Sequence, residues 1–125
     1  MGSIGTASPR RARLGRALAA LLAAALLGVA AAQTVVTVGF SLPLTGGAAK
    51  EGTEAQVGAE LAAQVINDAG GFQVGDQTVT FRVIFEDDQC NPQAGVEAAN
   101  RLVVAGAQFA GGSFCSSAAL SQMPV

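Results

Sequence analysis

Three runs of residues after position 32 have the hydrophobic pattern of β-strands. Residues 35–40 are rich in β-branched side chains, residues 78–86 alternate between polar and apolar before becoming continuously apolar, and residues 108–111 form a shorter run. Residues 72–77, which separate the first helical segment from the second run, contain a glycine and an aspartate. We expect a turn there.

Between these runs, apolar residues recur every three or four positions, which is typical of amphipathic helices. One helix is predicted from about residue 53 to residue 69, ending at the Gly70-Gly71 pair. Its apolar stripe comprises Gly58, Leu61, Ala62, Val65, Ile66 and Ala69. A second helix is predicted to begin at Pro92, capped by the side chain of Asn91, and to end by Gly106.

The order of these elements predicts an α/β fold, with a parallel sheet and helices on both faces. If the first strand lies between the other two, the chain leaves it in opposite directions and opens a crevice at the carboxyl ends of the strands. Residues 41–52 and 113–117 would border that crevice. Ser116 and Ser117 are expected to cap a further helix there.

Residues 1–32 have the three-part pattern of a cleavable secretory signal peptide. Four arginines precede an uncharged run from Ala17 to Ala32, which closes with three alanines. The run has only about 16 residues, whereas a membrane-spanning helix needs roughly 20. We therefore expect export, cleavage near Gln33, and a mature protein that is soluble outside the cytoplasm.

The charge of the mature chain argues against binding to nucleic acids. Four of the seven basic residues lie in the leader, whereas all nine acidic residues follow it, which leaves a net charge of -6. Only Lys50, Arg82 and Arg101 remain basic. Nucleic-acid binding normally needs clustered lysine and arginine.

The sequence offers little of the machinery that catalysis requires. It contains no histidine, so Ser-His-Asp and Cys-His arrangements cannot be assembled and zinc sites lose their commonest ligand. Residues 111–115 resemble the G-x-S-x-G nucleophile elbow, but Cys115 replaces the final glycine. Glycine-rich nucleotide-binding motifs are also absent. We expect a binding protein rather than an enzyme, with no cofactor and no metal.

Cys90 and Cys115 are the only cysteines, and in an exported protein an even number favours a disulfide. Both follow a predicted strand and so lie at the same end of the predicted sheet. Such a bridge would either brace the loop that carries Ser116 or act only as a covalent staple.

Several short motifs together resemble one protein family. They are Ser41-Leu42-Pro43-Leu44-Thr45-Gly46, Gly58-Ala59-Glu60, Ile66-Asn67-Asp68-Ala69-Gly70-Gly71, Asp87-Asp88-Gln89-Cys90-Asn91-Pro92 and Cys115-Ser116-Ser117. In this order and spacing they resemble the leucine/isoleucine/valine-binding proteins, the type I periplasmic components of branched-chain amino acid ABC transporters. The resemblance implies two α/β lobes with a hinged cleft, of which residues 33–125 would form part of the first.

The resemblance also implies roles for individual residues. Ser116 and Ser117 become the candidate ligand-binding residues, and Ser116, which follows the second cysteine, would hold the α-carboxylate of the ligand. The family often has a side-chain-pocket tyrosine where this chain has Glu51, which we expect to be a solvated loop charge. We expect Asp87 and Asp88 to order the neighbouring loops as hydrogen-bond acceptors.

The resemblance favours a periplasmic transport protein that binds an amino acid or amide, meets a membrane ABC permease transiently and is a monomer at full length. The chain is expected to end inside the first lobe, which leaves two alternatives open. One is a ligand-sensing ectodomain of the same fold, and the other is a secreted fragment that binds nothing. A second lobe would favour transport, whereas a transmembrane helix followed by a signalling domain would favour sensing.

Overall fold

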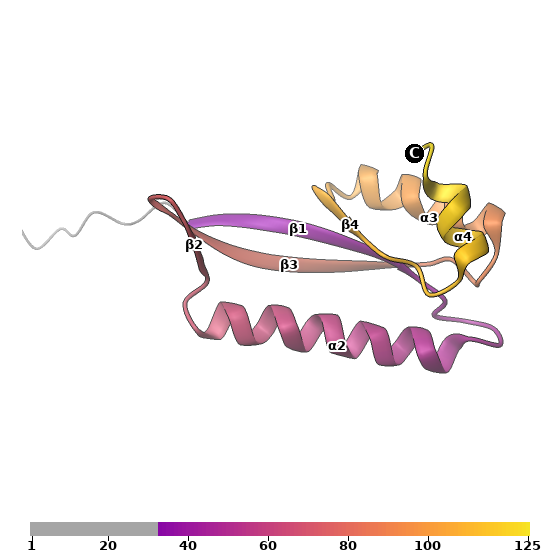
Figure 1. The fold of residues 1–125 in the computed structure, drawn as a ribbon, viewed down its shortest axis with the longest axis horizontal. Helices are drawn as coiled ribbons and strands as arrows, with labels where there is room; N and C mark the ends of the chain where they lie inside the picture. The colour runs from indigo at the N-terminus through magenta and orange to yellow at the C-terminus, as the bar shows by residue number, and fades with distance from the viewer. Residues whose placement is uncertain (1–32) are drawn as a thin grey trace, which may run out of the picture. The chain divides into compact units, whose positions relative to one another are not determined.

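The computed structural model describes residues 33–125, which form four strands and three helices (Figure 1). The strands are β1 (Gln33–Leu42), β2 (Phe72–Val74), β3 (Gln77–Asp87) and β4 (Phe109–Gly111). The helices are α2 (Ala49–Asp68), α3 (Pro92–Val104) and α4 (Ser116–Gln122). The signal peptide predicted for residues 1–32 lies outside the described residues.

The sheet has the strand order β2-β3-β1-β4. Strand β1 pairs in parallel with β3, from Gln33 opposite Thr78 to Leu42 opposite Asp87, and in parallel with the short strand β4. The first strand therefore lies between the other two parallel strands, which is the condition on which the expected crevice depended. Because the three strands are parallel, their carboxyl ends lie at one edge of the sheet.

The turn expected over residues 72–77 is wrong in part, because β2 pairs antiparallel with β3. Only Gly75 and Asp76 form the turn, and Gly75 has a φ of 60°, which few residues other than glycine adopt readily. A two-residue Gly-Asp connection between two short runs is itself a hairpin signal. The sheet is consequently mixed rather than wholly parallel.

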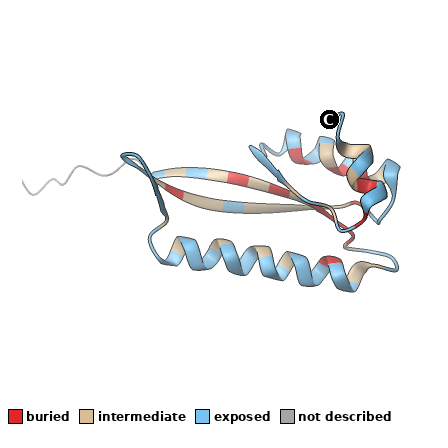
Figure 2. Ribbon diagram, in the orientation of Figure 1, coloured by how far each residue is buried: buried red, intermediate tan, exposed pale blue. Residues whose placement is uncertain are grey.

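Helices cover both faces of the sheet, as predicted (Figure 1). Helix α2 packs on one face, while α3 and α4 pack together on the other. Helix α3 approaches β1 closely at Gly39, where a Cβ atom would lie 2.9 Å from side-chain carbons of Leu102 and Ala107. The buried hydrophobic residues gather mainly around α3, α4 and the strand ends (Figure 2).

Helix α2 differs from the prediction in its start and in its buried face. It begins at Ala49 rather than near residue 53, and Leu61 and Val65 of the predicted stripe are 58% and 60% exposed. Ala62 and Ile66 of the predicted stripe do face the sheet, together with Ala59 and Ala63, across a gap of about 170 Å³. Sequence periodicity identifies an apolar face, but it does not show which part of that face a neighbour covers.

The predicted helix ends are confirmed for α2 and α3. Gly70 and Gly71 follow α2 with φ values of 94° and 89°, and the Asn91 side chain accepts hydrogen bonds from the first amides of α3. The prediction that Ser116 and Ser117 cap α4 is wrong. The N-cap residue is Cys115, and no side chain forms a capping hydrogen bond. Within residues 33–125, no helix has the length and apolar character needed to cross a bilayer.

Candidate functional site

Three loops meet at the edge of the sheet where β1, β3 and β4 end. They are residues 43–48, 88–91 and 112–115. The two loops predicted to border a crevice therefore do leave the same edge, and the loop after β3 joins them. This edge carries the polar side chains that the sequence singled out.

A disulfide joins Cys90 to Cys115, as predicted, with Cα atoms 5.3 Å apart. It connects the loop after β3 to the residue that precedes α4. Cys115 is buried, whereas Ser116 and Ser117, which follow it, are exposed. The bridge therefore fixes the backbone immediately before the two candidate serines.

Asp87 orders the loop that follows β1. Its Oδ1 atom accepts hydrogen bonds from the amides of Leu44 at 2.8 Å and Thr45 at 3.3 Å, and its Oδ2 atom accepts one from the Thr45 hydroxyl at 2.5 Å. The amide of Gln89 donates to Oδ1 at 2.9 Å. Partial burial by itself raises the pKa of Asp87, but the hydrogen bonds from Thr45, Gln89 and Leu44 outweigh it and lower the pKa below its ordinary value.

Asp88 orders the loops on the other side. Its carboxylate is fully buried and accepts hydrogen bonds from the hydroxyls of Ser41 at 3.1 Å and Ser113 at 2.7 Å, and from the Cys90 amide at 2.9 Å. The prediction that both aspartates act as loop-ordering acceptors is confirmed. Sequence reasoning did not find Ser41 and Ser113 as partners, because they become neighbours of Asp88 only when three strand ends meet.

The short turn after β3 has an unusual backbone. Gln89 and Cys90 have φ values of 52° and 55°, in the left-handed region that costs a residue other than glycine roughly 1–2 kcal/mol. Each of their amides donates to the carboxylate two residues earlier in the sequence. The two aspartates and the disulfide thus hold a turn that this sequence would not adopt readily by itself.

Glu51 was expected to lie in a loop, but it lies in the first turn of α2. Its side chain is exposed, so the expected contact with solvent is confirmed. The helix begins four residues earlier than the sequence pattern suggested, which is why a loop position was expected. A carboxylate is favourable in a first helical turn because of the helix dipole.

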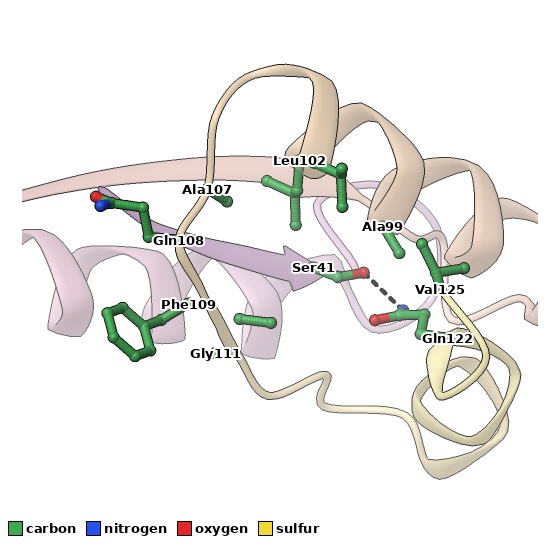
Figure 3. A pocket seen from close by; sticks show the side chains of 11 residues that line it. Ser41, Ala99, Leu102, Ala107, Gln108, Phe109, Gly111, Gln122 and Val125 are labelled. Carbon is green, nitrogen blue, oxygen red and sulfur yellow. Dashed lines mark hydrogen bonds between the residues drawn. The ribbon is translucent and has the colours of Figure 1, made fainter. Parts of the chain in front are cut away.

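A pocket of about 280 Å³ lies beside these loops, between α3, β4 and the end of α4 (Figure 3). Its walls include Leu102, Phe109 and Val125, and its polar groups include the Ser41 hydroxyl and the Gln122 amide, which are 2.8 Å apart. Ser116 and Ser117 do not line it. The mostly apolar lining is suited to packing of apolar side chains, so we place the candidate site at the loops instead.

The sequence of the described residues matches a known protein family. The family described as periplasmic binding protein matches residues 35–125, and the chain belongs to this family. Membership implies a location outside the cytoplasm. This family is a class of substrate-binding proteins.

Individual relatives carry more specific names. The chain is 42% identical over 93 residues to a Leu/Ile/Val-binding protein homolog from Brucella melitensis, covering 74% of this chain and 24% of the relative. It is 34% identical over 105 residues to a leucine-, isoleucine-, valine-, threonine- and alanine-binding protein from Pseudomonas aeruginosa, covering 84% of this chain and 27% of the relative. The chain therefore spans about a quarter of the length of these relatives.

A solved structure supports the fold. It is a solute-binding protein of an ABC transporter from Rhodopseudomonas palustris, in complex with 3,4-dihydroxybenzoic acid. The match has a TM-score of 0.51 and 27% identity, and it covers 72% of this chain and 23% of the other. Residues 33–125 fit part of one lobe of such a protein.

Proposed function

We propose that residues 33–125 belong to the substrate-binding component of an ABC transporter for branched-chain or related small amino acids or amides. The protein would bind its ligand in a cleft between two lobes and deliver it to a membrane permease. The names of the relatives from Brucella melitensis and Pseudomonas aeruginosa support this ligand class. A monomeric state at full length and a periplasmic location belong to the same proposal.

The observation that carries the proposal is the position of Ser116. Its exposed side chain directly follows a disulfide-bonded cysteine at the edge of the sheet where three loops meet. A serine hydroxyl there can donate a hydrogen bond to a carboxylate, and the next residue, Ser117, carries a second exposed hydroxyl. We propose that Ser116 receives the α-carboxylate of the ligand, with Ser117 as its neighbour in the site.

One lobe does not enclose a ligand. Ser116 is exposed in residues 33–125, and the groups that would bind the ammonium group and form the opposite wall belong to the remaining three quarters of the length seen in the relatives. Closure of two lobes removes water from the ligand and strengthens each hydrogen bond to its charged groups. The site we propose is therefore complete only in a two-lobed protein.

Isothermal titration calorimetry on the full-length protein that carries residues 33–125 tests the function. The ligands are L-leucine, L-isoleucine, L-valine, L-threonine, L-alanine, L-leucinamide and 3,4-dihydroxybenzoate. We expect at least one aliphatic amino acid to bind at micromolar concentration or below. Binding of dihydroxybenzoate without any amino acid would assign the protein to aromatic acids, and binding of none of these ligands would contradict the proposal.

A further inference from the structure

The Oδ2 atom of Asp88 lies at the centre of a hydrogen-bond chain that reaches both ends of α4. The Ser113 hydroxyl, three residues before the helix, donates to this oxygen at 2.7 Å. The Ser41 hydroxyl donates to it at 3.1 Å and accepts a hydrogen bond at 2.8 Å from the side-chain amide of Gln122, the last residue of α4 (Figure 3). One buried oxygen is therefore linked directly to the loop before α4, and through Ser41 to the last residue of α4.

The second oxygen of Asp88 fixes the covalent connection to the same helix. Oδ1 accepts a hydrogen bond from the amide of Cys90, and Cys90 is bridged to Cys115 immediately before α4. A buried carboxylate is stable only when its oxygens receive donors, so the three donors and the charge require one another. This requirement makes the arrangement specific, because displacement of the loop before α4 would remove the Ser113 donor from Asp88, and displacement of the end of α4 would remove the Gln122 donor from Ser41.

We infer that Asp88 is a positioning residue of the ligand site, which sets the place of Ser116 through Ser113. Asp88 does not contact the ligand in this account. It fixes α4 against the ends of β1 and β3, so that the Ser116 hydroxyl is already in place when the ligand arrives. This inference rests on the proposed function, since it concerns the same serine.

The test is a double-mutant cycle in the full-length protein, with L-leucine as the probe in calorimetry. Ser113→Ala removes one hydroxyl from the hydrogen-bond chain and leaves the buried carboxylate in place. It should therefore disturb folding less than a substitution of Asp88. We expect it to weaken L-leucine binding about 10-fold, the effect of one lost hydrogen bond. Ser116→Ala should then weaken binding by at most about 3-fold in the Ser113→Ala protein, compared with at least about 10-fold in the wild type.

Two variants separate positioning from a general loss of stability. Ser113→Thr keeps the hydroxyl and should restore binding to within about 3-fold of the wild type. Ser121→Ala removes a hydroxyl of the same helix that donates to the Pro92 and Ala118 carbonyls, each at 2.7 Å, and is not a partner of Asp88. Its effect should add to that of Ser116→Ala without coupling. If Ser121→Ala couples as strongly as Ser113→Ala, or if Ser113→Ala does not couple at all, the inference is overturned.

Hydrogen exchange provides a measurement that does not depend on the ligand. The amide of Ala119, which donates to the Cys115 carbonyl at 2.9 Å, should exchange at least about 10-fold faster in the ligand-free Ser113→Ala protein than in the wild type, because the loop before α4 loses its anchor. Unchanged exchange would overturn the inference even if L-leucine binds. A wild-type protein that binds no amino acid would overturn the proposed function instead, whatever the exchange rates show.

Discussion

The side chain of Asn67 forms hydrogen bonds with both backbone polar groups of Phe81. Its Nδ2 atom donates to the Phe81 carbonyl at 2.7 Å, and the Phe81 amide donates to Oδ1 at 2.8 Å. Strand β2 pairs with β3 only as far as Val79, so this stretch of the β3 edge has no strand partner in the described residues. Asn67, in the last turn of α2, replaces that partner and ties the helix to the sheet.

Replacement of Asn67 by alanine should therefore lower the free energy of unfolding by about 2 kcal/mol, roughly 1 kcal/mol for each lost hydrogen bond. Urea denaturation followed by circular dichroism measures this change. Asn100→Ala is the matched control, because the Asn100 side chain donates only to the Val96 carbonyl on the exposed surface of α3. Equal effects of the two substitutions would contradict the role assigned to Asn67.

The fold was largely predictable because its signals are local. Asn91 before Pro92 and the Gly70-Gly71 pair mark helix ends through backbone geometry that these residues adopt by themselves. The short strand β2 was missed because its three residues, Phe72–Val74, are too few to show a period, although the Gly-Asp turn was a usable signal. The exposure of Leu61 was not predictable, since burial depends on which neighbours cover a helix.

The site was predictable only in part. The order of the strands and the two cysteines indicated which loops would meet, and Asp87 and Asp88 were recognised as acceptors. Their donors were not, because Ser41 and Ser113 are 47 and 25 residues from Asp88 and no local pattern relates residues so far apart. The left-handed turn was also hidden, since it depends on those tertiary contacts.

Loss of the disulfide should destabilise the protein strongly. The bridge closes a loop with a sequence separation of 25, for which chain-entropy arithmetic gives about 3–4 kcal/mol. We expect the double variant Cys90→Ala, Cys115→Ala to unfold at a lower urea concentration, and reductant to shift the wild type in the same direction. Reductant should leave the double variant unchanged. If reductant does not change the urea concentration at which the wild type unfolds, the bridge has no stabilising role.

Stability should fall in acid partly because of Asp87. Since the pKa of Asp87 is lowered in the folded protein, the unfolded chain binds its proton first, and stability is present above about pH 4 and is lost as the pH falls through the lower, folded-state value. Asp87→Asn should flatten the fall in the free energy of unfolding between about pH 5 and pH 3. The measurement is urea denaturation at a series of pH values. An equally steep fall in Asp87→Asn would exclude this carboxylate as a source of the acid sensitivity.

Residues 33–125 alone should not bind amino acids measurably. Their candidate serines are exposed, and one hydrogen bond in water cannot offset the several kcal/mol of lost translational and rotational freedom on association. Calorimetry with L-leucine at millimolar concentration checks this expectation. Micromolar binding would mean that a single lobe contains a complete site, and the two-lobed account would then be wrong.

The role of the Ser116 hydroxyl can be measured by calorimetry. Wild-type and Ser116→Ala full-length protein are each titrated with the amino acid that binds best. If the Ser116 hydroxyl donates to the ligand carboxylate, its loss should weaken binding by roughly 1.5–3 kcal/mol, the range for a hydrogen bond to a charged group. The free energy of unfolding should change little, because the hydroxyl is exposed and caps no helix. An unchanged affinity for the amino acid in Ser116→Ala would contradict the account and remove Ser116 from the site.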